Sequence, residues 1–119
     1  MAEHNIIGQK GEQIAVETMR KKGFRVVDTN WKFGHLEMDV IAVNRKEIAF
    51  VEVKTRTSSF GDKRPEEFVD ELKRRRMAAA ANAYIKIHQI ELVPRFDIIG
   101  ISMDPNTYEV KELTHLEDA

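Results

Sequence analysis

The sequence contains no cysteine, which excludes disulfides, thiolate metal sites and cysteine nucleophiles. None of its apolar runs approaches the roughly 18 residues that a membrane-spanning helix needs, and its first residues lack the basic-then-apolar pattern of a secretory signal. We therefore expect a cytoplasmic protein that does not contact membranes. Phosphate-binding glycine loops, a Ser-His-Asp order and zinc-type histidine clusters are also missing, so kinases, serine hydrolases and zinc hydrolases fit poorly.

Neither sign of charge dominates the sequence. Its 19 basic and 20 acidic residues leave a formal net charge of −1, so the overall balance does not predict a nucleic-acid binder, although a local basic patch would still allow one. A chain of 119 residues with 42% hydrophobic content predicts a single globular domain over residues 1–119.

Hydrophobic periodicity and turn residues predict an α/β fold with a mixed central sheet flanked by helices. We expect the tail over residues 114–119 to be frayed. The second helix is expected to open at Pro65 and to turn an apolar face that includes Phe68, Val69 and Leu72 toward the core. The expected elements are a helix over residues 5–22, with Asn5 as N-cap, strands over 24–31, 37–43 and 48–54, a helix from 65, and strands over 95–101 and 107–113.

Acidic residues stand where the third and fourth expected elements would ordinarily carry apolar side chains. Alternate side chains of a strand share a face, and a polar turn over residues 44–47 fixes the register of this hairpin. That register pairs Val43 with Ile48, Ile41 with Phe50, Asp39 with Glu52, and Glu37 with Lys54.

Asp39 and Glu52 are therefore expected to face each other in a sheet that is otherwise apolar on both faces, which indicates a covered position. Like charges directly opposed across two strands destabilise the pair. Two carboxylates there share a proton, pair with cations or hold a metal ion. The structural alternative is a buried salt bridge of either carboxylate with Lys54, which lies two residues from Glu52 on the same face.

Glu12 is expected near the centre of the inward stripe of the first helix. A carboxylate there needs a partner; the alternative is a partly exposed Glu12 or an ion pair. Three carboxylates, Glu12, Asp39 and Glu52, without a thiolate favour Mg²⁺ or Mn²⁺. Such an ion would polarise a phosphoryl oxygen and activate a bound water. Lys54 would position that water or stabilise the developing charge, and hydrolysis of a phosphodiester needs these parts.

Two basic segments are candidates for nucleic-acid contacts. Arg56 lies in a polar loop over residues 55–64 that either contacts phosphates or is simply solvated. The run Lys73-Arg74-Arg75-Arg76 on the second helix is either a solvated face or a clamp on a phosphate backbone. Lys73 is the member of this run that we expect to point toward the carboxylates.

Two further features have a structural and a functional interpretation. Trp31 and Phe33 fit stacking on a nucleobase, but core or rim positions are the simpler interpretation. Asp97 is most simply a structural partner of Arg95 or of another basic residue.

The order Asp39, a turn, then Glu52-Val53-Lys54 resembles the PD-(D/E)xK nuclease signature, with Met38 in place of its proline. The whole chain resembles the small YraN-like family of uncharacterised bacterial proteins, which have an endonuclease-like fold akin to archaeal Holliday-junction resolvases. One departure is Leu36, where that family usually has glycine; Gly34 lies two residues earlier. The residues that carry the resemblance are Gly11-Glu12 with Ala15, Glu37 to Ala42, Phe50 to Arg56, Pro65 to Glu67, Lys73 with Ala80 and Tyr84, and Arg95 to Asp97.

The resemblance implies a restriction-endonuclease-like core with Glu12, Asp39 and Glu52 as metal ligands and Lys54 as the catalytic lysine. The sequence thus leads to one preferred hypothesis, a Mg²⁺-dependent endonuclease that acts on DNA, including branched or recombination intermediates. Two alternatives are a non-catalytic nucleic-acid-binding module and a scaffold that retains the nuclease fold. A homodimer would suit a duplex or junction substrate.

Overall fold

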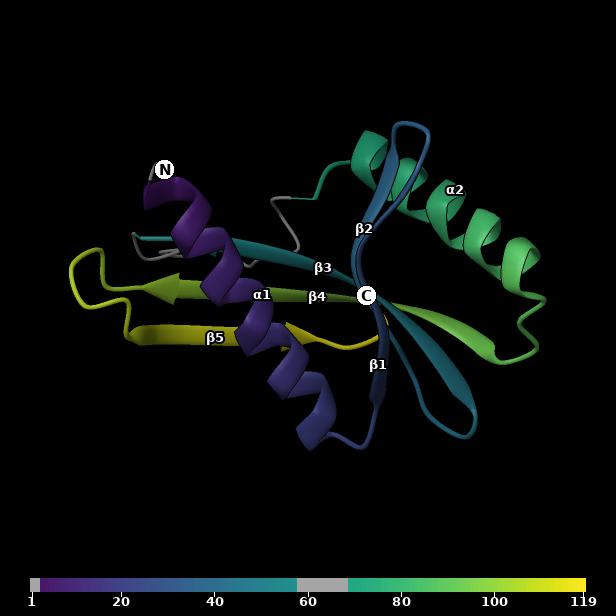
Figure 1. The fold of residues 1–119 in the computed structure, drawn as a ribbon, viewed down its shortest axis with the longest axis horizontal. Helices are drawn as coiled ribbons and strands as arrows, with labels where there is room; N and C mark the ends of the chain where they lie inside the picture. The colour runs from purple at the N-terminus through teal and green to yellow at the C-terminus, as the bar shows by residue number, and fades with distance from the viewer. Residues whose placement is uncertain (1–2, 58–68) are drawn as a thin grey trace.

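The computed structural model describes residues 3–57 and 69–119, with side chains from residue 6 onward. Pro65 and Phe68, and the loop residues Lys63 and Arg64, lie outside these ranges. The order is helix, three strands, helix, two strands (Figure 1). The elements are α1 (Glu3–Lys21), β1 (Arg25–Phe33), β2 (Leu36–Val43), β3 (Glu47–Arg56), α2 (Glu71–His88), β4 (Val93–Met103) and β5 (Val110–Leu116).

The strands form one mixed sheet in the order β1-β2-β3-β4-β5. Only β3 and β4 run parallel, and the other neighbours are antiparallel. The parallel pair requires a crossover connection, which α2 supplies. The expectation of a mixed α/β fold is confirmed. Within the described ranges, neither helix combines the length and apolarity that crossing a membrane requires.

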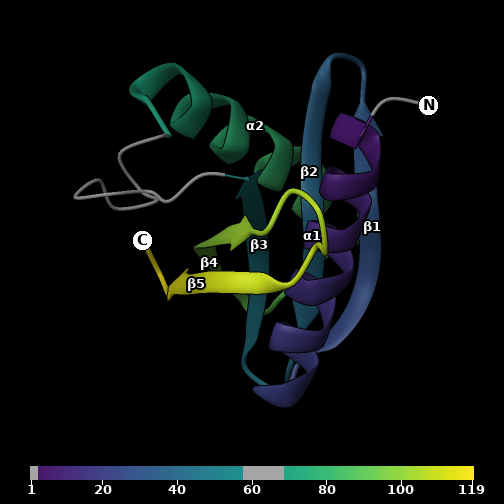
Figure 2. The ribbon, with the colours of Figure 1, turned by 90° about the vertical axis from the view of Figure 1, so that its left-hand side faces the viewer.

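The two helices cover opposite faces of the sheet (Figure 2). Where β2 and β3 pair and are covered on both faces, over residues 40–43 and 48–51, they are continuously apolar. On the α1 side the core residues are Ala15, Met19, Phe24, Val40, Ala42, Ala49, Val51, Ile99, Ile101 and Met103. On the α2 side they are Met38, Ile41, Ile48, Phe50, Val69, Met77, Ala80, Ala81, Tyr84 and Ile98.

Helix α1 packs on β3 through a stripe of small and flexible residues. Gly11, Ala15 and Met19 recur every fourth residue and are buried, which is one face of a helix. A Cβ atom at Gly11 would collide with the Thr55 methyl group, so glycine permits the close approach. The helix begins at Glu3, so Asn5 lies within it and is not its N-cap.

Helix α2 begins at Glu71, and Asp70 is its N-cap: Lys73 N donates to Asp70 Oδ1 at 2.8 Å. Val69, expected within the helix, therefore precedes it. The sequence also predicted Leu72 on the buried face of this helix, but the residue is 55% exposed. The buried stripe of α2 recurs at three- and four-residue spacings, and Leu72 falls outside it. That stripe is Met77, Ala80, Ala81 and Tyr84.

The carboxyl-terminal residues are not frayed, contrary to expectation. The last strand runs to Leu116, and His115 pairs with Ile99 of β4. Ala119 N then donates to Phe96 O at 2.7 Å. The prediction failed because polar residues of β5 bind charged residues of β4, as His115 binds Asp97. Hydrophobicity alone therefore does not mark the end of this strand.

Candidate metal and nucleic-acid site

Strands β2 and β3 part at Asp39. Their ladder joins Val40–Val43 to Ile48–Val51 in the expected register, with Ile41 opposite Phe50. At the next position Val53 N donates to the Asp39 side chain, at 2.8 Å from Oδ2. Beyond it, β2 turns away with β1 while β3 continues along the sheet (Figure 1). The expected pairing of Glu37 with Lys54 is wrong, because the β2–β3 ladder ends at Val40–Val51 and exposed Glu37 pairs only with Lys32 of β1.

An irregularity in β1 accompanies this separation. Asn30 adopts a left-handed backbone conformation, with φ of 49°, which asparagine tolerates better than most residues. In the β1–β2 register Asn30 lies across from Asp39, between the pairs Thr29–Val40 and Trp31–Met38. Two residues apart, Met38 and Val40 should share a face, yet they pack on opposite sides of the sheet. The sequence pattern placed Asn30 within a strand over residues 24–31 and did not single it out.

Glu52 and Asp39 form a pair of carboxyl groups where β2 and β3 separate, and nearby positive charge does not fully balance them. Glu52 is only 7% exposed, and the two carboxyl groups are hydrogen-bonded to each other. Burial, and then the charge of Asp39, raise the pKa of Glu52 to about 7. Burial also raises the pKa of Asp39, although the Val53 N–H donor opposes this. The pair therefore retains a proton more readily than ordinary carboxyl groups do.

Lys73, at the start of α2, supplies the nearest cation. Its Nζ lies 3.3 Å from Glu52 Oε2, and its charge lowers the pKa of both carboxyl groups without cancelling the effect of burial. The expectation that Lys73 points toward the carboxylates is confirmed. Lys54 is half-buried on the same face as Glu52 and makes no ion pair with a described residue. The alternative of a Lys54 salt bridge is therefore wrong, and Lys73 takes that place.

Glu12 approaches from α1, on the other side of the sheet. It is half-buried at the edge of the helix stripe rather than at its centre. Its Oε1 accepts a hydrogen bond from Asn30 Nδ2 at 2.8 Å. Burial and, to a smaller extent, the charge of Asp39 raise the pKa of Glu12, against the effect of the Asn30 bond. Asn30 thus links α1 to the opening at Asp39, where carboxylates from three elements gather.

The donor set has the chemistry that a hard divalent cation requires. All three side chains offer carboxylate oxygens, and burial raises the pKa of each of them. In the described part of the chain, the oxygens of Glu12, Asp39 and Glu52 are not all within 4.8 Å of one another. A single ion held by all three would therefore require a side-chain rotation, whereas Asp39 and Glu52 already meet.

The other expected contact residues lie on β3 and α2. Arg56 is half-buried at the end of β3. Arg74, Arg75 and Arg76 are exposed on the first turns of α2, and Arg75 Nη2 lies 3.0 Å from Glu71 Oε1. Together with Lys73 they form a cationic helix end beside Glu52. That these residues bind nucleic acid stays a prediction.

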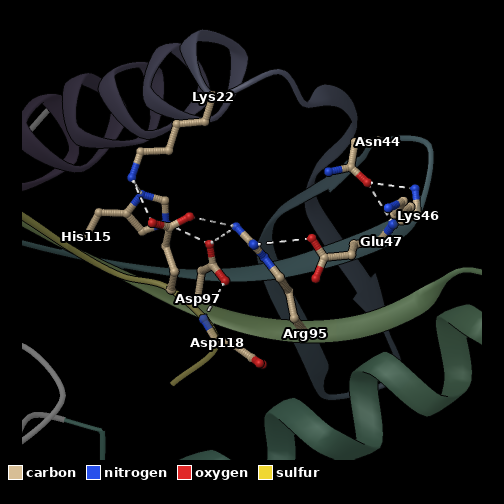
Figure 3. A network of polar contacts seen from close by, with 9 residues as sticks. Lys22, Asn44, Lys46, Glu47, Arg95, Asp97, His115 and Asp118 are labelled. Atoms are coloured by element: carbon tan, nitrogen blue, oxygen red, sulfur yellow. Dashed lines mark hydrogen bonds and ion pairs between the residues drawn. The ribbon is translucent and has the colours of Figure 1, made fainter.

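A second charged cluster, drawn in Figure 3, joins β4, β5 and Lys22, which follows α1. Asp97 is completely buried. Its Oδ2 lies 3.0 Å from Arg95 Nη2 and 2.6 Å from His115 Nε2, and Asp118 N donates to its Oδ1. The expectation of an Asp97–Arg95 partnership is confirmed. Burial raises the pKa of Asp97, but these donors outweigh it and the pKa is lowered.

This second cluster also contains three potential metal ligands. One ligand atom each of Asp97, His115 and Glu117 lies within 4.8 Å of the other two. Cations already occupy it: Lys22 Nζ lies 2.8 Å from His115 Nδ1 and 3.3 Å from a Glu117 oxygen. Because the ammonium donates to Nδ1, the His115 proton lies on Nε2, facing Asp97. A metal ion here would have to displace Lys22.

The family model and the relatives that match this chain all belong to one protein family. The sequence model of "Uncharacterised protein family UPF0102" matches residues 11–101. The chain is 39% identical over 119 residues to a UPF0102 protein of Porphyromonas gingivalis, covering all of this chain and 87% of that relative. It is 39% identical over 120 residues to one of Flavobacterium psychrophilum (97% of that relative) and 41% identical to one of Parabacteroides distasonis (95%). The matched segment contains all three carboxylates, Lys54 and the basic run.

Proposed function

This chain belongs to uncharacterised protein family UPF0102, and we propose that it is a metal-dependent nuclease that hydrolyses phosphodiester bonds in DNA. The observation that carries the proposal is the contact of half-buried Asp39 with buried Glu52, whose pKa values are raised first of all by burial and are not brought back by the one nearby ammonium of Lys73. Strongly perturbed carboxyl groups in an opening of a sheet are candidates for function. The ordered set Glu12, Asp39, Glu52, Lys54 adds the residues that phosphodiester hydrolysis needs.

Mg²⁺ or Mn²⁺, when bound, would polarise the phosphoryl oxygen and lower the pKa of a bound water. Asp39 and Glu52 would hold the ion, and Glu12, oriented by Asn30, would hold it directly or through water. Lys54, on the same face as Glu52, would orient the attacking water or stabilise negative charge on the phosphoryl group. Arg56 and the cationic end of α2 would hold neighbouring phosphates in place.

Lys73 has a specific part in this proposal. Its ammonium lies on Glu52, where a divalent cation would compete with it. Once displaced, a lysine at the start of α2 is beside Arg74 and able to contact a phosphate. Lys73 would thus stabilise the carboxylates before the ion arrives and hold DNA afterwards.

The test is cleavage of supercoiled, linear, single-stranded and branched DNA with Mg²⁺ or Mn²⁺. We expect Asp39→Ala and Lys54→Ala to abolish product formation, while Lys86→Ala, an exposed lysine near the far end of α2, leaves the rate unchanged. Circular dichroism of each variant controls for folding. Cleavage that persists in both Asp39→Ala and Lys54→Ala would sink the proposal.

A non-catalytic DNA-binding module is the second candidate, favoured by one observation: Lys73 already partly neutralises Glu52. In that case DNA binding would be salt-dependent, since neutralised phosphates release counterions. Reversing charge at Arg74 and Arg76 would weaken it, and Mn²⁺ would not bind to the Asp39–Glu52 pair.

A further inference from the structure

The β1–β2 hairpin continues beyond the carboxylates as a two-stranded arm, residues 31–38. The arm starts where β2 leaves β3 at Asp39 and ends in a two-residue turn, Gly34 and His35, closed by the pair Phe33–Leu36. Gly34 has φ of 62°, and glycine at the first position of such a turn matches the twist of a hairpin. The arm is thus a defined structure that projects from the site (Figure 1).

Two aromatic rings lie parallel on this arm. The rings of Trp31 and Phe33 are stacked, with centroids 6.0 Å apart and planes 3° from parallel. Trp31 is fixed in turn by Tyr84 of α2, which meets it edge-on at 5.2 Å and 84°. Tyr84 is buried, and its hydroxyl donates to Asp28 Oδ2 at 2.8 Å. A chain of contacts from the core therefore orients the Phe33 ring.

Phe33 itself remains 52% exposed. Single exposed apolar side chains are common and need no explanation, but a ring held parallel to a tryptophan is a preformed surface for another flat ring. Trp31 packs on the α2 side of the sheet, and Phe33, two residues on, shares its face. Glu52 meets Lys73 of α2, so the Phe33 ring and the Glu52 carboxyl group both lie on the α2 side of the sheet.

The spacing fits a nucleic acid strand. From Asp39 to Leu36, the partner of Phe33, the arm rises three residues, or about 10 Å at the usual strand rise. That is about three steps of a stacked strand at ~3.4 Å each. The cationic end of α2 provides the complementary charge for a polyanion, and the exposed residues around Phe33, Lys32 and His35, do not form a larger apolar patch of the kind that marks a protein interface.

We propose that Phe33 is a stacking platform for an unpaired base, about three nucleotides from the phosphate that lies at Asp39 and Glu52. This inference rests on the proposed function for the identity of the ligand, and it defines the substrate class: DNA with single-stranded or splayed nucleotides beside the cleaved bond. Paired bases are already stacked within a duplex and do not present a free face to the ring.

Trp31 is the only tryptophan of the chain, so its fluorescence reports directly on the arm. The experiment titrates a single-stranded oligonucleotide, and the duplex of the same sequence, into the full-length protein without divalent metal. We expect the single strand to quench Trp31 and to bind more tightly than the duplex. Phe33→Ala should weaken single-strand binding about 5- to 150-fold, the loss of one stacked base, and Phe33→Tyr should restore it.

Val110→Ala is the matched control, because Val110 is an exposed apolar residue of β5; it should leave affinity unchanged. Wild-type affinity in Phe33→Ala, or no quenching by any oligonucleotide, would overturn the inference. The proposed function can fail separately. If Asp39→Ala cleaves DNA at the wild-type rate, the proposed nuclease site is wrong, but a Phe33-dependent affinity still stands. If cleavage requires Asp39 but Phe33→Ala binds single-stranded DNA normally, only the proposed stacking platform is wrong.

Discussion

Half-buried Asp39 and fully buried Asp97 lie on the same sheet in opposite electrostatic surroundings. Asp97 receives an arginine, a histidine and a backbone N–H, and its pKa is lowered. Asp39 receives one backbone N–H and faces a second carboxyl group, and its pKa is raised. Helix α1 contributes Glu12 near Asp39, and Lys22, directly after the end of this helix, contacts His115 beside Asp97.

We interpret the Asp97 cluster as structural and propose that the Asp39 site is functional. At Asp97 cations balance the carboxylates, and the result ties β4, β5 and the end of α1 together. At Asp39 the fold places one half-buried and one buried carboxylate beside one lysine, which destabilises the folded state unless a proton or a metal ion is added. Such a shortage of positive charge is typical of sites where a bound ligand supplies the missing charge.

The largest expected effect comes from replacing aspartate by asparagine, separately at Asp97 and at Asp39. Asp97→Asn removes the charge that pairs with Arg95 and weakens the acceptor of the His115 Nε2 proton, and breaking a buried ion pair costs about 3–5 kcal/mol of unfolding free energy. Asp39→Asn keeps an oxygen for the Val53 N–H but relieves repulsion with Glu52, so it should leave stability unchanged or increase it in metal-free buffer. Urea unfolding at about pH 8 measures both. Equal losses in the two variants would contradict the comparison.

The two regions should also differ in their response to pH. The pKa of Glu52 is raised from 4.5 to about 7, so its contribution to stability is present below about pH 4.5 and is lost as the pH rises through 7. The whole interval is worth at most about 3 kcal/mol. The lowered pKa of Asp97 acts in the opposite direction, with stability lost only as the pH falls below its ordinary 3.8.

Metal-free protein should therefore become less stable to urea from about pH 5 to about pH 8.5, and Glu52→Gln should flatten that slope. The control is Glu71→Gln, an exposed carboxylate on α2, which should preserve it. A wild-type slope of zero over this range would show that the Asp39–Glu52 pair carries no excess of negative charge.

A smaller effect tests how α1 is held between the two regions. Gly11→Ala introduces a methyl group against Thr55, and overpacking of this kind costs about 1–3 kcal/mol. Gly8→Ala meets no atom within 4 Å and should stabilise the helix by up to about 1 kcal/mol. Thermal unfolding compares the two. Equal effects would mean that the contact with Thr55 does not position α1.

The smallest effect is expected at Lys22, whose side chain is 39% exposed where it meets Glu117. Lys22→Met should cost less than about 1 kcal/mol, since exposed ion pairs contribute little. Because Arg95 remains on Asp97, the fold should persist. A loss as large as that of Asp97→Asn would make Lys22 an essential part of the cluster.

The sequence predicted the mixed sheet, the register of Ile41 with Phe50, and the approach of Lys73 to the carboxylates, because hairpin geometry and alternation are local properties. It did not predict the separation at Asp39, since this depends on the left-handed Asn30 in the neighbouring strand. Strand β5 was placed too early because its polar residues serve a cluster built from distant segments. Long-range charge partners are not visible in local patterns.

The most direct test of the account is calorimetric titration of Mn²⁺ into the wild type, Glu52→Gln and His115→Gln. The account predicts one binding event in the wild type that is lost in Glu52→Gln and retained in His115→Gln. Loss in His115→Gln with retention in Glu52→Gln would place the ion at Asp97, His115 and Glu117, and would contradict the assignment of Asp39 and Glu52 as the metal site.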